Sequence, residues 1–167
     1  MRIPRFHRFL IPVLIFFCFW ALPSLASDYF TVRHVSDGDT IVLDNGKKVR
    51  LIGIDTPEMR DESRNQKNAA RNHLSAEIVN DFAARAKFFV TDQIQGKKVR
   101  LEYDWQRTDK YGRTLAYVYR EPDGYFLNAE IVRQGYGFGY FAFPFRYSHV
   151  FYDYMKEART QKRGLWK

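Results

Sequence analysis

The chain has 167 residues, with 27 Lys and Arg against 19 Asp and Glu, and 46% of it is hydrophobic. This length suits one domain with a full hydrophobic core and leaves no room for a second domain of ordinary size. The only cysteine, Cys18, lies in an N-terminal segment that we expect to be removed, which excludes disulfide and thiol chemistry in the remainder. The basic charge indicates a polyanionic partner, although charge alone is weak evidence.

The N-terminal segment has the pattern of a secretion signal. Three arginines within the first eight residues precede an almost unbroken apolar run from Phe9 to Ala21, and small residues follow at Ser24 and Ala26. We expect residues 1–26 to be a signal peptide cleaved after Ala26, leaving a domain of residues 27–167. The alternative, an uncleaved membrane anchor, is disfavoured by the prolines in this segment.

Cleavage would remove three basic residues and no acidic one, so the domain would carry a formal charge of +5. We expect a secreted or periplasmic monomer with no stable membrane association after cleavage. Nucleic acid is the expected partner.

Three strands are predicted at the start of the domain, over residues 29–35, 40–43 and 47–54. Asn45-Gly46 separates the second and third and is the strongest short signal for a hairpin. The hairpin should bring Asp39, at the start of one strand, beside Asp55, at the end of the other. Two carboxylates placed so close repel each other unless a positive group lies between them.

The rest of the chain predicts helices and two more strands. Residues 59–71 are polar and mixed in charge, which indicates an exposed loop or a marginal helix. Apolar residues at helical spacing from Leu74 predict a helix of about twenty residues, capped by Ser75, with a break near residues 80–81 as the alternative to one continuous helix. Strands are expected over residues 97–103 and 113–119, and helices over residues 126–133 and 151–162. The expected fold is α+β, a five-stranded OB-type β-barrel with about three helices.

The polar groups that this arrangement gathers suit the hydrolysis of a phosphodiester. Asp39 and Asp55 are hard oxygen ligands of the kind that select Ca²⁺ or Mg²⁺. Two arginines can bind one phosphate through paired N–H···O hydrogen bonds and stabilise the negative charge that develops in the transition state. Glu58, if it is not a metal ligand, can orient or deprotonate the attacking water.

These residues occur in motifs that resemble the staphylococcal-type, thermonuclease-like nucleases. The motifs span residues 37–40, 50–58, 107–113, 127–135 and 164–166, in order and at compatible spacing. The resemblance implies an OB barrel that cleaves DNA and RNA with Ca²⁺ and leaves a 3′-phosphate and a free 5′-hydroxyl.

The resemblance also implies roles for individual residues. Asp39, Asp55 and Thr56 correspond to calcium ligands, Thr56 through its backbone carbonyl. Arg50, Arg113 and Glu58 correspond to the catalytic residues, the arginines as phosphate clamp and Glu58 as the water-activating carboxylate. Lys110 and Tyr111 correspond to residues that hold a neighbouring phosphate. Tyr140 and Phe141, with Phe143 as an alternative in an uncertain register, correspond to aromatic residues near the nucleotide base.

Two features leave alternatives open. The segment from residue 59 to residue 80 is longer than in the type member of the family, which affects access to the cleft. The aromatic rings near residue 141 could stack on bases or simply pack at the barrel edge. A different function, an inactive OB module that only binds nucleic acid or protein, is disfavoured because the expected catalytic acids and arginines are all present.

Overall fold

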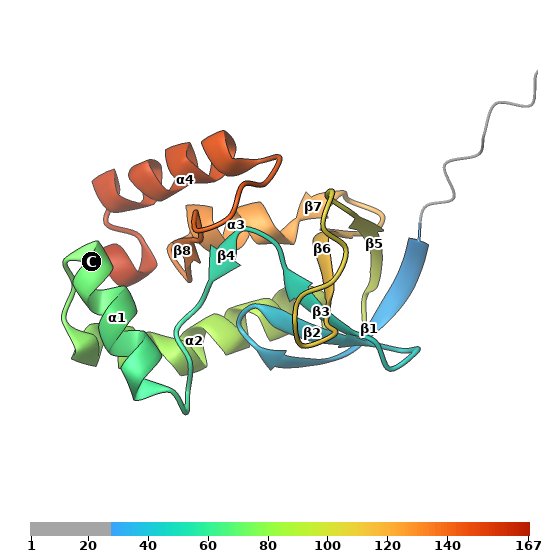
Figure 1. Ribbon diagram of the computed structural model, residues 1–167, viewed down its shortest axis with the longest axis horizontal. Coiled ribbons are helices and arrows are strands. Elements are labelled where there is room, and N and C mark those ends of the chain that lie inside the picture. Colours follow the sequence, from blue (N-terminus) through green and yellow to red (C-terminus); the bar gives the residue numbers. More distant parts are fainter. Residues whose placement is uncertain (1–27) are drawn as a thin grey trace, which may run out of the picture.

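The computed structural model describes residues 28–167, and its centre is a closed barrel of five strands (Figure 1). The strands are β1 (Asp28–Asp37), β2 (Thr40–Leu43), β3 (Lys48–Leu51), β5 (Lys98–Glu102) and β6 (Thr114–Arg120). They pair in the order β3-β2-β1-β5-β6, and parallel pairing of β3 with β6 closes the barrel. The predicted five-stranded barrel and the α+β class are therefore confirmed.

Side chains alternate between the two faces of each strand, so apolar residues fill the barrel and polar residues point out of it. On β3, Val49 and Leu51 are fully buried in the core, while Arg50 between them points to the other face. Ile41 and Leu43 of β2 pack into the same core. The hairpin between β2 and β3 is antiparallel, as its turn sequence predicted.

The predicted strand over residues 47–54 is not continuous. After β3 the chain turns at Gly53, whose φ is +77°, and resumes as β4 (Ile54–Asp55), which pairs with β8 (Phe138–Gly139). A Cβ atom at Gly53 would lie 2.5 Å from the ring of Phe145, so glycine is required both for backbone conformation and for space. This break moves Asp55 out of the barrel wall and toward the pocket described below.

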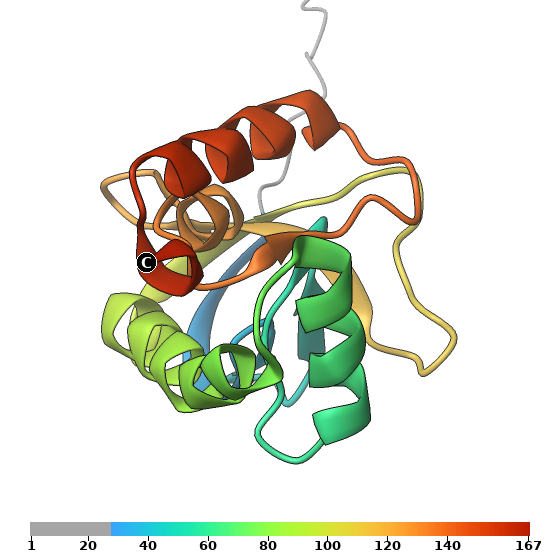
Figure 2. The ribbon, with the colours of Figure 1, turned by 90° about the vertical axis from the view of Figure 1, so that its left-hand side faces the viewer.

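Four α-helices within residues 28–167 surround the barrel, where the sequence predicted about three. They are α1 (Glu62–Asn72), α2 (Ala76–Ile94), α3 (Leu127–Arg133) and α4 (Ser148–Thr160), followed by a 3₁₀ turn (Gly164–Trp166); β7 (Tyr125–Phe126) pairs with β6. Figure 2 shows α1 and α2 below α4, with α1 beside the end of the barrel. Within residues 28–167, no helix combines the length and the apolar character needed to cross a membrane.

The additional helix is α1, in the segment expected to be a loop or a marginal helix. The Asp61 carboxylate caps it by accepting a hydrogen bond from the Arg64 N–H (2.9 Å). Its buried residues, Asn65, Asn68 and Ala69, are mostly polar, and it packs on α2. Without a row of apolar residues, its sequence gave no helical periodicity to detect.

The long helix α2 begins as predicted, with Ser75 as its cap: the Ser75 hydroxyl accepts a hydrogen bond from the Ile78 N–H (3.2 Å). It is not broken near Asn80 and Asp81, because both residues lie on its exposed side. Val90 and Ile94 of α2 are fully buried in the barrel core, so the helix closes one end of the barrel.

Asn128 of α3 ties that helix to the barrel. Its side-chain oxygen accepts a hydrogen bond from the Val118 N–H (2.9 Å). Its side-chain N–H₂ donates to the carbonyls of Ile52 (3.0 Å) and Ala116 (3.2 Å). The buried Asn128 amide thus holds α3 to strand β6 and to the turn that leads into β4.

Candidate active site

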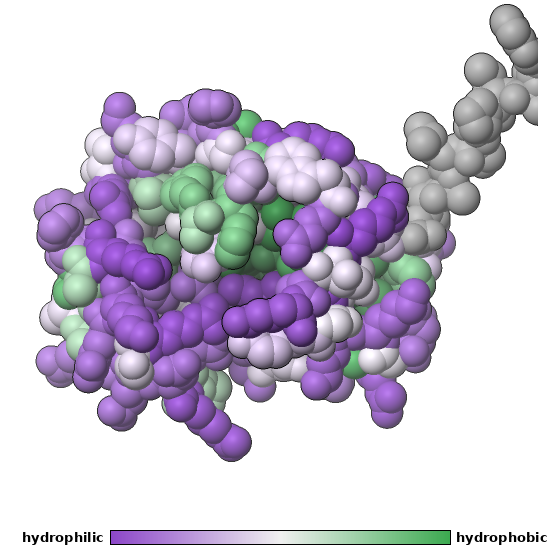
Figure 3. All heavy atoms as spheres, in the orientation of Figure 1, coloured by the Kyte–Doolittle hydropathy of each residue, from purple (hydrophilic) through white to green (hydrophobic). Residues whose placement is uncertain are grey.

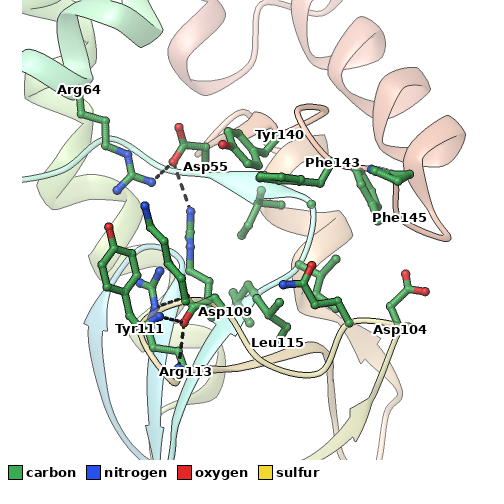
Figure 4. A pocket seen from close by; sticks show the side chains of 18 of the residues that line it. Asp55, Arg64, Asp104, Asp109, Tyr111, Arg113, Leu115, Tyr140, Phe143 and Phe145 are labelled. Atoms are coloured by element: carbon green, nitrogen blue, oxygen red, sulfur yellow. Dashed lines mark hydrogen bonds and ion pairs between the residues drawn. The ribbon is translucent and has the colours of Figure 1, made fainter.

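A cleft of about 590 Å³ opens where β3, β4 and α1 meet two loops. The residues of these loops that line the cleft lie within residues 104–113 and 140–145. In Figure 3, apolar side chains gather at the centre of this face of the molecule, and hydrophilic side chains border them. Figure 4 shows charged side chains from α1, β4 and the loop before β6 on one side and the rings of Tyr140, Phe143 and Phe145 on the other. The cleft therefore combines a charged side with an aromatic side.

Arg50 lies between the two carboxylates that the hairpin was expected to bring together. Strand register places Thr40 opposite Arg50, so the guanidinium reaches Asp39 in an ion pair, and its second nitrogen lies 3.3 Å from Asp55 Oδ1. Burial lowers the pKa of Arg50 to about 10. The Asp55 carboxylate raises this pKa, whereas the nearby cations Arg64 and Arg113 lower it further. Arg50 remains a cation at neutral pH, and it provides the positive group that two adjacent carboxylates require.

Helix α1 brings a second arginine to the same carboxylates. Arg64 is ion-paired with Asp55 and, at 2.6 Å, with Glu58 Oε1. Burial alone would lower the pKa of Arg64, but the Asp55 and Glu58 carboxylates outweigh burial and raise this pKa. Asn68, one turn further along, donates a hydrogen bond to Asp55 Oδ2 (2.9 Å). The Asp55 carboxylate is thereby held by three side chains.

Glu58 is held through its backbone by a buried asparagine of α1. The Glu58 N–H donates to Asn65 Oδ1 (2.8 Å), and Asn65 Nδ2 donates to the Glu58 carbonyl (2.7 Å). Burial, followed by the negative charge of Asp37, raises the pKa of the Glu58 carboxyl. A carboxylate with raised proton affinity is a stronger base than an ordinary glutamate.

A group of three carboxylates in the site has the dimensions of a metal site. Oxygen atoms of Asp37, Asp39 and Glu58 all lie within 4.8 Å of one another. Oxygen ligands on opposite sides of Ca²⁺ are separated by about 5 Å, twice the usual Ca–O distance of about 2.4 Å. The donors are all hard oxygens, so the group fits a calcium-type ion.

Thr56 lies against this acidic group. Its backbone N–H donates to Asp39 Oδ2 (3.1 Å), and its buried hydroxyl oxygen has no hydrogen-bond partner in the described part of the chain. A buried oxygen without a partner is consistent with a ligand or ion nearby. Of the predicted ligands, Asp39 therefore belongs to the cluster and Thr56 lies beside it. Asp55 is not one of its three carboxylates and is instead paired with the two arginines.

The second predicted arginine, Arg113, lies in the same cleft and is held by Asp109. Its Nε donates to Asp109 Oδ2 (2.7 Å) and its backbone N–H to Asp109 Oδ1 (2.9 Å). Burial alone would raise the pKa of Asp109, but these hydrogen bonds outweigh burial and lower it. Lys110 and Tyr111 are exposed on the same turn, and the Lys110 Nζ lies 5.0 Å from the centre of the Tyr111 ring.

The aromatic predictions separate into two groups. Tyr140 and Phe143 both line the cleft, with ring centres 6.1 Å apart. Phe141 is absent from the lining, and its ring packs against Phe145 and Tyr152. The alternative position, Phe143, therefore replaces Phe141 as a candidate for contact with a base.

Four residues of the site carried no role in the sequence interpretation. Asp37 lies inside the motif of residues 37–40 and Asp109 inside that of residues 107–113, but the sequence assigned a role to neither. Arg64 and Asn68 lie four residues apart, which places them on one face of a helix. That signal becomes visible only once residues 59–71 are known to be helical.

Comparison with known proteins agrees with this geometry. Residues 48–167 match a family described as staphylococcal nuclease homologue. The chain is 32% identical over 148 residues to the thermonuclease of Staphylococcus intermedius, covering 86% of this chain and 79% of that protein. It is 33% identical over 141 residues to the thermonuclease of Staphylococcus hyicus, covering 82% and 75%. An uncharacterized endonuclease of Escherichia coli is 34% identical over 160 residues, covering 93% of this chain and 88% of that protein.

Proposed function

The chain belongs to the family of staphylococcal nuclease homologues and is a nuclease, and from this premise we propose the details of its reaction. It is an exported, Ca²⁺-dependent endonuclease that hydrolyses DNA and RNA and leaves a 3′-phosphate. The observation that carries the proposal is the convergence of Arg50 and Arg113 on one cleft beside the carboxylate group of Asp37, Asp39 and Glu58.

The two arginines are proposed to bind the scissile phosphate from two sides. Arg50 reaches the cleft from β3, and Arg113 reaches it from the end of the loop that leads into β6, so two separate strands of one barrel position them. In Figure 4 the Arg113 side chain lies at one end of the charged side of the cleft, and Arg64 and Asp55 lie together at the other end. Guanidinium groups held this way stabilise the charge that develops on the phosphoryl oxygens.

Glu58 is the proposed general base. It would accept a proton from a water molecule that attacks phosphorus, the bond from phosphorus to the 5′ oxygen would break, and that oxygen would leave as a hydroxyl after taking up a proton. The phosphate then remains on the 3′ oxygen. The raised pKa of Glu58 supports this role, because it brings the carboxylate closer to the strength that proton abstraction requires.

Asp39, Asp55 and Thr56 are the proposed holders of Ca²⁺, and Asp37 joins them because its carboxylate lies in the same cluster as that of Asp39. Bound there, the ion would polarise a phosphate oxygen. For Asp55 to become a ligand, its ion pairs with Arg50 and Arg64 must loosen. An arginine released in this way is free to face the phosphate.

The substrate contacts proposed beyond the scissile phosphate come from both sides of the cleft. Lys110 and Tyr111, both exposed on the turn before Arg113, would hold the neighbouring phosphate. Tyr140 and Phe143 would stack on bases, a contact worth about 1–3 kcal/mol per base. The protein is proposed to act as a monomer in the periplasm or outside the cell.

Release of acid-soluble nucleotides from denatured DNA tests the proposal. We expect release with Ca²⁺ and none with a chelator, and Glu58→Gln to lower the rate while leaving Ca²⁺ and substrate binding largely intact. Equal release in both conditions would remove the calcium requirement. Binding of DNA without release in either condition would instead support the inactive binding module.

A further inference from the structure

Helix α1 presents a basic face to the cleft. Arg64, Lys67, Asn68 and Arg71 all line it, at positions three, four and seven residues apart. These intervals place the side chains on one side of a helix. The span from Arg64 to Arg71 is about 10 Å along the helix axis at 1.5 Å per residue. That length matches about three stacked nucleotides of one strand at 3.4 Å each.

The residues of this face divide by what they already contact. Arg64 and Asn68 are engaged with carboxylates of the site, Arg64 with Asp55 and Glu58 and Asn68 with Asp55. Lys67 and Arg71 are exposed, and neither forms an ion pair with any residue between 28 and 167. Their charges therefore serve no internal contact that would explain why they line the cleft.

The charge of the whole lining favours an anionic ligand. Six of the lining residues are basic and three are acidic. All three acids are already engaged: Asp55 by arginines, Asp104 by the Tyr117 hydroxyl (2.6 Å) and Asp109 by Arg113. The uncompensated positive charge is concentrated on Lys67 and Arg71 of α1 and on Lys110 of the facing loop.

Exposed rings from the two loops that line the cleft complete a surface for a strand. Trp105, Tyr111 and Phe143 line the cleft with 66%, 72% and 64% of their surfaces exposed. Aromatic rings that face solvent inside a basic groove can stack on bases while the cations hold the backbone. An isolated phosphate or a small acidic metabolite would use the cations and leave these rings uncovered.

We propose that the α1 face formed by Lys67 and Arg71 is a binding site for the sugar–phosphate backbone of a polynucleotide, holding phosphates beyond the scissile one. This inference rests on the proposed nuclease function, which it deepens, because it makes affinity depend on strand length. Arg64 would link the new site to the catalytic carboxylates at the end of the same face.

The test compares the binding of two fluorescent oligonucleotides by anisotropy, in the presence of a chelator so that neither is cleaved. We expect the double substitution Lys67→Gln and Arg71→Gln to weaken binding of a twelve-nucleotide thymidine strand by about tenfold or more, and binding of a dinucleotide by less than about twofold. Loss of two phosphate contacts should also reduce the slope of log affinity against log salt by about 1.4.

The matched control is Lys47→Gln with Lys156→Gln, which removes the same charge from exposed residues outside the cleft. We expect this control to bind both strands within about twofold of the unmodified protein. Undetectable binding of the twelve-nucleotide strand by the unmodified protein, unchanged binding by the α1 variant, or equal weakening by the control would each overturn the inference. A separate cleavage assay with Ca²⁺ reports on the proposed function, so failure there is distinguishable from failure here.

Discussion

The position of Arg113 depends on Asp109 as much as on the strand that follows it. The carboxylate of Asp109 accepts hydrogen bonds from the Arg113 Nε and from the backbone N–H groups of Tyr111 and Arg113. Because the same carboxylate also binds the backbone of the turn, the ion pair holds the guanidinium in one place. A donor that stabilises a transition state must be fixed in this way.

Replacing Arg113 by alanine is expected to lower turnover by about two to three orders of magnitude, as does the loss of one transition-state donor in other enzymes. The side chain is 29% exposed, so the variant should remain folded, which urea unfolding would verify. Arg113→Lys retains the charge without the fork of N–H groups and should recover only part of the rate. Near-normal turnover of the alanine variant would show that the clamp is elsewhere.

Asp104, at the edge of the cleft, makes stability depend on pH. Burial alone would raise the pKa of this carboxyl, but hydrogen bonds from the Tyr117 hydroxyl (2.6 Å) and the Arg146 N–H (2.8 Å) outweigh burial and lower it below the ordinary value of 3.8. A carboxyl with a lowered folded-state pKa contributes stability above its ordinary pKa and loses that contribution as pH falls through the folded-state value.

We therefore expect Asp104→Asn to be less stable than the unmodified protein at neutral pH, and the difference in free energy of unfolding to shrink as pH falls below about 4. Urea unfolding at a series of pH values measures this difference. Tyr117→Phe removes only one of the hydrogen-bond donors to Asp104, so its loss of unfolding free energy should depend on pH less than that of Asp104→Asn. A difference that stays constant from neutral pH to acid would rule out a contribution from ionised Asp104.

At the scale of elements, α1 is the feature that connects folding to the site. It supplies Arg64 and Asn68 to Asp55, and Asn65 holds both backbone polar groups of Glu58. Asn65 is 1% exposed, so the loss of its amide would leave the half-buried backbone groups of Glu58 without these two partners.

Asn65→Ala is expected to lower the free energy of unfolding by about 1–3 kcal/mol and to reduce turnover, because Glu58 would lose its fixed position. Gln66→Ala, the next residue along α1 but exposed to solvent, is the matched control and should change neither quantity appreciably. Urea unfolding and the nucleotide-release assay measure the two effects. If Asn65→Ala behaved like the control, α1 would not position Glu58.

The sequence predicted the elements whose signals are local and apolar. Alternation and the Asn45-Gly46 turn predicted the hairpin that places Arg50 beside Asp39, and Ser75 marked the start of α2. The break at Gly53 was missed because it depends on the ring of Phe145, far along the chain. The helix α1 could not be decided from an exposed loop because asparagines, whose partners lie in other segments, form much of its buried face.

At the scale of the whole molecule, the chain is a basic barrel with its cleft between the barrel end, α1 and the loop before α4. The N-terminal residues 1–26, interpreted as a signal peptide, lie outside the described residues, so this assignment is a prediction. Mass spectrometry of the protein exported by its host is expected to find an N-terminus at Ser27. A product that retains Met1 and fractionates with membranes would support the uncleaved anchor instead.

The proposed arrangement places a calcium ion between Asp39, which precedes β2, and Asp55, on β4, while Arg50 and Arg113 bind the phosphate beside the ion. A crystal structure with Ca²⁺ and a nucleoside 3′,5′-diphosphate tests it most directly. We predict Ca²⁺ at about 2.3–2.6 Å from oxygens of Asp39 and Asp55, with Arg50 and Arg113 both bound to one phosphate. An ion bound elsewhere, or Arg50 still paired with both carboxylates while the phosphate lies outside the cleft, would contradict it.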